Sequence, residues 1–180
     1  MDHAIQTKAL RYRAGKEFEI RDLALKVPVG SVYGFLGPNG SGKTTTIRLL
    51  LGQLRPRAGS ISVLGYDVPD QTTQMLAHTG YVPERPHLYP SLTVNEAMQL
   101  HAAFFKNWDW SRAEELVTQF GLRRDQHIGR LSKGETGKAM MLLALAQTPS
   151  LLILDEPTDG LDPVARRDVL SSAGRVRVGR

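Results

Sequence analysis

A glycine-rich stretch at residues 34–50, GFLGPNGSGKTTTIRLL, constrains the fold of this chain more than any other feature. Residues 37–44 match G-x-x-x-x-G-K-[ST] and lie between a strand-like apolar run and a helical pattern. Glycines let successive backbone N–H groups curve around an anion without interference from Cβ atoms. The helix that follows points its positively polarised N-terminus at the same place. The stretch therefore predicts a phosphate-binding loop between a strand and a helix of an α/β fold.

The loop supplies a set of candidate nucleotide-binding residues. The Lys43 ammonium can reach the β- and γ-phosphates of a nucleotide, and the Thr44 hydroxyl can ligate Mg²⁺. A glycine-rich turn with a chance lysine is the alternative, which the flanking strand and helix patterns disfavour. The candidate residues are Gly37, Pro38, Asn39, Gly40, Ser41, Gly42, Lys43, Thr44 and Thr45.

A second motif, LLILDEP, occupies residues 151–157. Its continuous apolar run predicts a strand that is buried on both faces, as in a parallel sheet. Asp155 stands where P-loop NTPases place a carboxylate associated with Mg²⁺, and Glu156 can orient or deprotonate the attacking water. Acidic residues after a strand are a weak signal alone, but beside the glycine loop they predict a nucleotide-hydrolysing site.

The rest of the chain places these motifs on secondary structure. Residues 4–64 contain strand-like pieces, KALRYR, FEIRDLALKV, SVYGFL and SISVLG, interrupted by the loop and by a helix over residues 44–51. The apolar face of that helix is expected to be Ile47, Leu50 and Leu51. The order of strand, helix and buried strand argues for an α/β core with a parallel sheet.

A mostly helical insert is expected over about residues 88–147. Capping boxes predict three helix starts, at TVNE (93–96), SRAE (111–114) and SKGE (132–135). Gly121 is expected to end the second helix.

Taken together, the motifs resemble those of the nucleotide-binding (ATPase) domain of an ABC transporter, over about residues 5–170. LSKGE (131–135) resembles the family signature LSGGQ, and TDGLDP (158–163) resembles the D-loop. YVPERPHLYPSLTV (81–94) resembles the Q-loop segment. The resemblance implies a P-loop NTPase fold with an antiparallel β subdomain and a helical insert subdomain. It also implies ATP and Mg²⁺ as cofactors.

The resemblance assigns further site residues. Tyr12 resembles the aromatic residue that stacks on adenine, and an ordinary strand tyrosine is the alternative. Glu84 stands where the family usually has Gln, so the resemblance implies a role in catalysis and in binding Mg²⁺. The resemblance also implies that Ser132 and Gly134 contact the γ-phosphate held by an opposite subunit. It assigns Asp162 as the D-loop aspartate.

Two residues depart from the family signature. Lys133 replaces a glycine, and Glu135 replaces the glutamine. The added cation suits a site for the γ-phosphate, whereas the added anion opposes it.

The implied working unit is a head-to-tail dimer of two ATP-binding subunits with two ATP molecules between them. The implied second partner is a membrane-spanning permease subunit on a separate chain. The apolar runs, such as AMMLLALA at residues 139–146, are too short to span a bilayer, and the N-terminus lacks a signal-peptide pattern. We therefore expect a protein on the cytoplasmic face of the membrane, where it energises an exporter. The absence of cysteine suits a reducing compartment.

The C-terminal end departs from the family pattern, in which a further strand carries a switch histidine. The histidines of this chain, His3, His78, His87, His101 and His127, all precede Asp155. We therefore expect residues 1–180 to form a single ABC-type domain that is incomplete at its C-terminus. In the family fold, loss of that strand would leave two central strands without their shared neighbour.

Other functions remain open from the sequence. The formal charge of +5 could suit nucleic acid, anionic lipid or polyanionic small molecules, or simply reflect a solvated basic surface. A soluble ABC-type ATPase acting on nucleic acid or ribosomes is one alternative, although that branch carries two such domains, so nucleic acid is not the expected partner. A non-catalytic remnant is another. The cluster FFKNWDW (104–110) predicts either a contact patch for the membrane subunit or helix-core packing.

Overall fold

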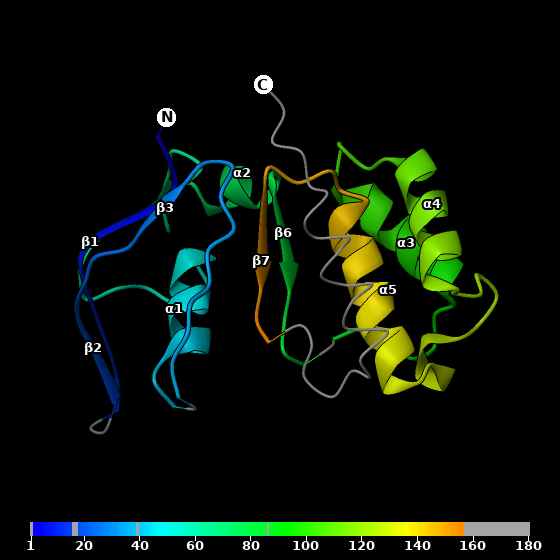
Figure 1. The fold of residues 1–180 in the computed structure, drawn as a ribbon, viewed down its shortest axis with the longest axis horizontal. Helices are drawn as coiled ribbons and strands as arrows, with labels where there is room; N and C mark the ends of the chain where they lie inside the picture. The colour runs from blue at the N-terminus through cyan, green and yellow to red at the C-terminus, as the bar shows by residue number, and fades with distance from the viewer. Residues whose placement is uncertain (1, 16–17, 39, 86, 157–180) are drawn as a thin grey trace. The chain divides into compact units, whose positions relative to one another are not determined.

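The computed structural model describes residues 2–15, 18–38, 40–85 and 87–156 (Figure 1). Asn39 and Asp162 therefore lie outside the described residues. The described chain divides into two compact units, one that ends at Leu76 and one that begins at Ala77.

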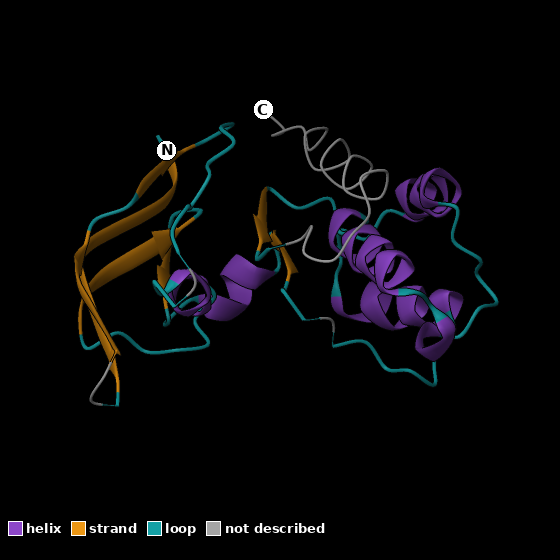
Figure 2. Ribbon diagram, turned by 60° about the horizontal axis from the view of Figure 1, so that its bottom comes forward, coloured by secondary structure: helices purple, strands orange, loops and turns teal. Residues whose placement is uncertain are grey.

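The first unit is built on an antiparallel sheet. Its strands are β1 (His3–Ala14), β2 (Phe18–Leu23), β3 (Lys26–Pro28), β4 (Ala58–Val63) and β5 (Tyr66–Val68). The order is β2-β1-β4-β5, β3 also pairs with β1, and every pair runs antiparallel. Figure 2 shows the helices of this unit on one side of the sheet. The expected antiparallel β subdomain is confirmed.

Two helices complete this unit, α1 (Lys43–Leu50) and α2 (Thr72–Leu76). The expected apolar face of α1 is confirmed, because Ile47, Leu50 and the following Leu51 are buried. Leu49 is also buried, with none of its surface exposed. This apolar side fixes α1 in the unit and so positions the glycine loop that precedes it.

Residues 31–36, SVYGFL, do not form the strand that their sequence predicts. They make no ladder with another strand among the described residues, and Val32 and Leu36 are 97% and 92% exposed. A strand is stabilised by hydrogen bonds to a neighbour and by burial of alternate side chains. The described part of the chain supplies neither at this segment, so the apolar pattern alone does not produce a strand.

The second unit combines a pair of strands with helices. β6 (Thr79–Val82) and β7 (Leu151–Leu154) pair in parallel, which confirms the expected parallel arrangement. β7 is less buried than its sequence predicts, since Ile153 is buried whereas its three leucines are only partly so. The helices are α3 (Val94–Phe104), α4 (Trp110–Phe120), the short 3₁₀ helix η1 (Ile128–Arg130) and α5 (Lys133–Leu145).

The core of the second unit gathers apolar side chains from β6, α3, α4 and α5. Met98, Leu116, Met141 and Leu142 are completely buried there. The apolar run AMMLLALA is explained by this core, because α5 is buried on most of its circumference. No helix among the described ranges has the length and apolarity that crossing a bilayer requires.

Two of the three predicted helix starts are confirmed. Reciprocal capping boxes join Thr93 to Glu96 and Ser132 to Glu135. The start predicted from SRAE is wrong, because α4 begins earlier, at Trp110. Its cap is Asp109, whose carboxylate accepts a 3.0 Å hydrogen bond from the Arg112 backbone N–H. An aspartate at this position caps as well as a serine, and it comes first along the chain.

Gly121 ends α4, as predicted, with a φ of 65°.

The FFKNWDW cluster is divided between the core and the surface. Trp108 packs against the core and against Trp110, with ring centroids 5.6 Å apart, whereas Phe104 is 76% exposed.

Candidate functional site

The glycine loop of the first unit forms a tight turn in front of α1. Gly40 and Gly42 have φ values of 80° and 96°, which favour glycine over other residues. The Ser41 N–H donates a 3.2 Å hydrogen bond to the Pro38 carbonyl, which closes the turn. A Cβ atom on Gly37 would lie 2.7 Å from Ser41 Oγ, so a larger residue does not fit there unchanged. The loop therefore exposes its backbone on a curve that L side chains would obstruct.

Lys43 is the first residue of α1, and its side chain folds back over the loop. Its ammonium Nζ donates to the carbonyl oxygens of Gly37 at 2.9 Å and Pro38 at 3.2 Å. The N-cap residue Gly42 has no side chain to cap the helix, and the first turn contains no acidic residue. The positively polarised helix end and the ammonium thus converge on one loop, as phosphate binding requires.

An aromatic side chain that the sequence did not single out also contacts this loop. A Cβ atom on Gly42 would lie 2.6 Å from Phe18 Cζ, so the ring edge of Phe18 rests on the backbone of Gly42. Phe18 pairs with Ala14 across the hairpin of β1 and β2, and Ile20 pairs with Tyr12. Because paired residues share a face of the sheet, Tyr12 and Phe18 lie on the same face. In the sequence, the alternation of Phe18 and Ile20 indicates that Phe18 lies on the apolar face of a strand. Its contact with Gly42 depends on tertiary structure and cannot be seen in the sequence.

Three acidic residues follow the carboxyl ends of the strand pair in the second unit. Val82 of β6 is in register with Leu154 of β7, and the Asp155 N–H donates to the Val82 carbonyl at 2.9 Å. Glu84 follows β6, and Glu156 follows Asp155, so all three carboxylates come after the carboxyl ends of adjacent parallel strands. Ligands of α/β proteins bind at such edges.

The three carboxylates differ in environment. Asp155 is only 2% exposed, whereas Glu84 and Glu156 are exposed. Glu156 has a φ of 49°, a conformation that costs a residue with a side chain about 1–3 kcal/mol. Within the part of the chain that the structure describes, no three histidine or acidic side chains are close enough to form a ready metal site.

The signature residues lie at the N-terminus of α5 in the second unit. The Glu135 N–H donates to Ser132 Oγ at 3.2 Å, and the Ser132 N–H donates to the Glu135 carboxylate at 2.8 Å. The backbone N–H of Ser132 and then its hydroxyl lower the pKa of Glu135 below its usual value of 4.5. Ser132 and Lys133 are exposed, and Gly134 is partly exposed in the first turn. The helix end therefore presents a hydroxyl, a cation and a carboxylate.

The structure thus assigns the predicted residues to two groups. Gly37 to Thr45, apart from Asn39, lie with Tyr12 in the first unit. Glu84, Ser132, Gly134, Asp155 and Glu156 lie in the second unit.

Comparison with known proteins places the chain in a family. The sequence model of the ABC transporter family matches residues 20–159. A Nod factor export ATP-binding protein I from Burkholderia orbicola (strain AU 1054) is 37% identical over 168 residues, which are 90% of this chain and 55% of the relative. The bacitracin transport ATP-binding protein BcrA from Bacillus licheniformis is 34% identical over 171 residues, which are 94% of this chain and 56% of the relative.

A solved structure agrees with the sequence comparisons. The ATP-binding subunit of an ABC transporter matches with a TM-score of 0.86 at 31% identity, covering 96% of this chain and 74% of that one. This chain spans about half the length of the curated relatives it matches. The family match covers most of the chain and includes the phosphate-binding loop, and the chain therefore belongs to the ABC transporter family of ATPases, with its α/β P-loop NTPase fold.

Proposed function

We propose that this chain is an ATP-binding and ATP-hydrolysing subunit that energises an ABC exporter through a separate membrane-spanning chain. The geometry of the glycine loop carries the proposal. Lys43 bonds the carbonyls of Gly37 and Pro38, and the Gly42 N-cap leaves the α1 terminus without a side-chain cap. A bound triphosphate would replace the loop carbonyls as the partner of the ammonium, and charge-assisted bonds to phosphate are stronger than bonds to carbonyls.

The chemistry of the donor set fits Mg²⁺, which prefers oxygen ligands. Thr44 offers a hydroxyl, Asp155 a buried carboxylate and Glu84 a second carboxylate after the neighbouring strand. If these residues held Mg²⁺, the ion would supply positive charge that offsets the negative charge developing during phosphoryl transfer. Glu84 adds a negative charge where the family usually has a neutral amide, which strengthens attraction for a divalent cation.

Glu156 is proposed to orient the attacking water and to accept its proton. It is exposed and follows the proposed metal ligand Asp155 directly. Its left-handed backbone conformation costs free energy, and such strain is concentrated at functional positions. Lys43 and the loop N–H groups would then stabilise the charge on the transferring phosphoryl group.

The hairpin face that carries Tyr12 and Phe18 is proposed to receive the adenine ring. Phe18 rests on Gly42, so this face borders the phosphate-binding loop. An aromatic side chain can stack on a base, and such a stack suits the end of the nucleotide opposite the γ-phosphate.

The proposed active unit is a head-to-tail dimer, in which the α5 terminus of one subunit meets the nucleotide of the other. Ser132, Gly134 and Asp162 would contribute to that contact. Lys133 supplies a cation that offsets the Glu135 carboxylate at the same helix end. The names of the relatives from Burkholderia orbicola and Bacillus licheniformis concern export and transport, which supports the exporter assignment and a place on the cytoplasmic face of the membrane through a permease subunit.

Nucleotide binding tests the proposal without requiring a membrane partner. Lys43→Ala should weaken binding of a fluorescent ATP analogue by roughly 10- to 100-fold, the value of a charge-assisted bond. Lys26→Ala removes an exposed lysine of the same unit and should leave binding unchanged. Glu156→Gln should keep binding and lower ATP turnover, in the complex with the permease subunit, by roughly 100-fold or more. Equal binding by the Lys43 and Lys26 variants would refute the assignment of the loop.

A further inference from the structure

The outer face of the antiparallel sheet carries a set of cations that nucleotide binding does not use. Lys8 pairs with Ser60, Lys26 pairs with Gln6, and Arg13 pairs with Glu19. Alternation along the strands, shifted by one residue at the bulge between Lys8 and Arg11, puts these residues on the face opposite the buried Thr7 and Leu10. We call this surface the basic face, and its cations are Lys8, Arg11, Arg13, Arg21 and Lys26, all of them exposed.

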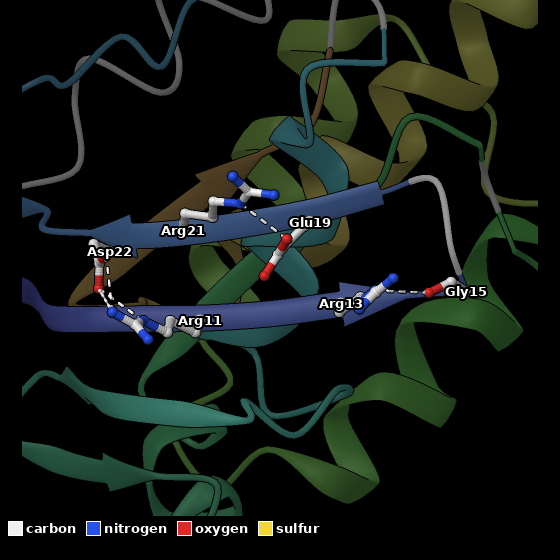
Figure 3. Close-up of polar contacts among 6 residues, drawn as sticks. All are labelled: Arg11, Arg13, Gly15, Glu19, Arg21 and Asp22. Atoms are coloured by element: carbon white, nitrogen blue, oxygen red, sulfur yellow. Dashed lines mark hydrogen bonds and ion pairs between the residues drawn. The ribbon is translucent and has the colours of Figure 1, made fainter.

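The basic face keeps a net positive charge after its ion pairs are counted. Arg11 pairs with Asp22 at 2.8 Å, and Arg21 pairs with Glu19 at 2.9 Å (Figure 3). Among the residues that the structure describes, Lys8, Arg13 and Lys26 form no ion pair. The exposed Asp67 shares this face, because it pairs with Ser62, which pairs with Gln6. Five cations against three carboxylates, Glu19, Asp22 and Asp67, leave a formal charge of +2 on one face.

The arginines of these ion pairs can exchange their carboxylate partners for other anions. The side chains of Arg11 and Asp22 are 57% and 58% exposed, so the pair is screened by water and contributes little to stability. Figure 3 shows both pairs and Arg13 along the hairpin of β1 and β2. A dense array of phosphates could therefore engage Arg11 and Arg21 as well as the unpaired cations.

The chemistry of the basic face favours a membrane surface over nucleic acid. The aromatic residues that could stack on bases, Tyr12 and Phe18, lie on the other face of the hairpin. The neighbours of the cations are short polar residues, Gln6, Ser60 and Ser62, on a sheet surface and not on a helix that could enter a groove. A sheet face with spread cations is complementary to a plane of lipid headgroup phosphates.

We propose that the basic face binds the anionic phospholipid headgroups of the membrane. This interaction goes beyond ATP hydrolysis and needs neither nucleotide nor a permease subunit. Each lysine or arginine at an anionic surface strengthens binding by roughly fivefold, and the effect weakens within a Debye length and with added salt.

The test uses the full 180-residue chain with vesicles of defined composition. Sedimentation should recover the chain with vesicles of phosphatidylcholine and phosphatidylglycerol, but not with phosphatidylcholine alone or at 0.5 M salt (about the condition where the Debye length falls below 5 Å). The triple variant Lys8→Gln, Arg13→Gln, Lys26→Gln should bind about 100-fold more weakly. A charge-retaining variant, Lys8→Arg, Arg13→Lys, Lys26→Arg, should bind like the wild type.

A matched control removes the same charge from the second unit through Lys106→Gln, Arg123→Gln and Arg130→Gln. This variant should bind vesicles like the wild type, and circular dichroism should show native spectra for all variants. Equal losses in the control and the basic-face variant would overturn the proposal, because net charge alone would then explain binding. Binding of wild-type chain to RNA but not to anionic vesicles would overturn it as well. Nucleotide binding should be unchanged in the triple variant, so this test stands apart from that of the proposed ATP site.

Discussion

Gly42→Ala is the substitution that most sharply tests the described geometry of the glycine loop. Gly42 has a φ of 96°, and a Cβ atom there would lie 2.6 Å from Phe18 Cζ. The substitution therefore incurs two separate costs, one from the backbone conformation and one from the displaced ring. Each cost can be measured by itself, because Phe18 can be changed independently and another glycine offers a control.

The size of each cost follows from the local structure. An alanine in a left-handed conformation costs about 1–2 kcal/mol. Overpacking typically costs about 1–3 kcal/mol, and since the end of the Phe18 ring can shift, we expect the lower part of that range. Gly42→Ala should thus lower the free energy of unfolding by about 2–3 kcal/mol. In a Phe18→Leu background, the ring carbon is gone, and the same substitution should cost only about 1–2 kcal/mol.

Urea unfolding followed by circular dichroism measures these differences. Gly30→Ala is the matched control, because Gly30 lies in the same unit with a φ of 73° and no atom within 4 Å of an added Cβ. It should therefore show the backbone cost alone. If Gly42→Ala costs no more than Gly30→Ala, or if Phe18→Leu leaves its cost unchanged, the contact between Phe18 and the loop is refuted.

Further predictions concern the second unit. Burial lowers the pKa of His101 below its usual 6.5, so the unfolded chain binds more protons and the free energy of unfolding should decrease as the pH falls through 6.5. His101→Phe should remove this decrease in urea unfolding, and an unchanged pH profile would contradict the assignment. Ser132→Ala should lower the free energy of unfolding by about 1 kcal/mol, because it removes the N-cap of α5. Urea unfolding followed by tryptophan fluorescence measures this change. Because the pKa of Glu135 is lowered in the folded chain, its ionised carboxylate stabilises the fold above pH 4.5. The free energy of unfolding should therefore decrease on acidification below pH 4.5 in the wild type, and this part of the decrease should be absent in Glu135→Gln.

Local chemistry explains which parts of the structure could be predicted from sequence. The glycine loop, the start of α1 and the caps at Thr93 and Ser132 are defined within a few residues of chain. Glycine at positive φ, a hydroxyl at an N-cap and a glutamate three residues later act over one turn. Their patterns therefore predict structure without knowledge of the rest of the fold.

Features that depend on distant neighbours could not be predicted in the same way. Residues 31–36 have the composition of a strand, but whether they form one depends on a partner strand. Phe18 reaches Gly42 because the hairpin register turns its ring toward the loop, which no local pattern encodes. The cap of α4 shows a milder limit, since Asp109 and Ser111 are both good caps and the structure uses the first.

Coupling between nucleotide binding and metal binding tests most directly the central proposal, that the glycine loop and the carboxylate of Asp155 act on one ATP molecule. Isothermal titration calorimetry would compare ATP binding with and without Mn²⁺, used as a substitute for Mg²⁺, in the wild type and in Asp155→Asn. We expect Mn²⁺ to tighten ATP binding by roughly tenfold in the wild type, within the usual range of coupling between sites. We also expect Asp155→Asn to lose this gain while keeping the metal-free affinity, and Lys43→Ala to bind ATP roughly 10- to 100-fold more weakly in both conditions. A gain that persists in Asp155→Asn would contradict the claim that the loop and this carboxylate share one ligand.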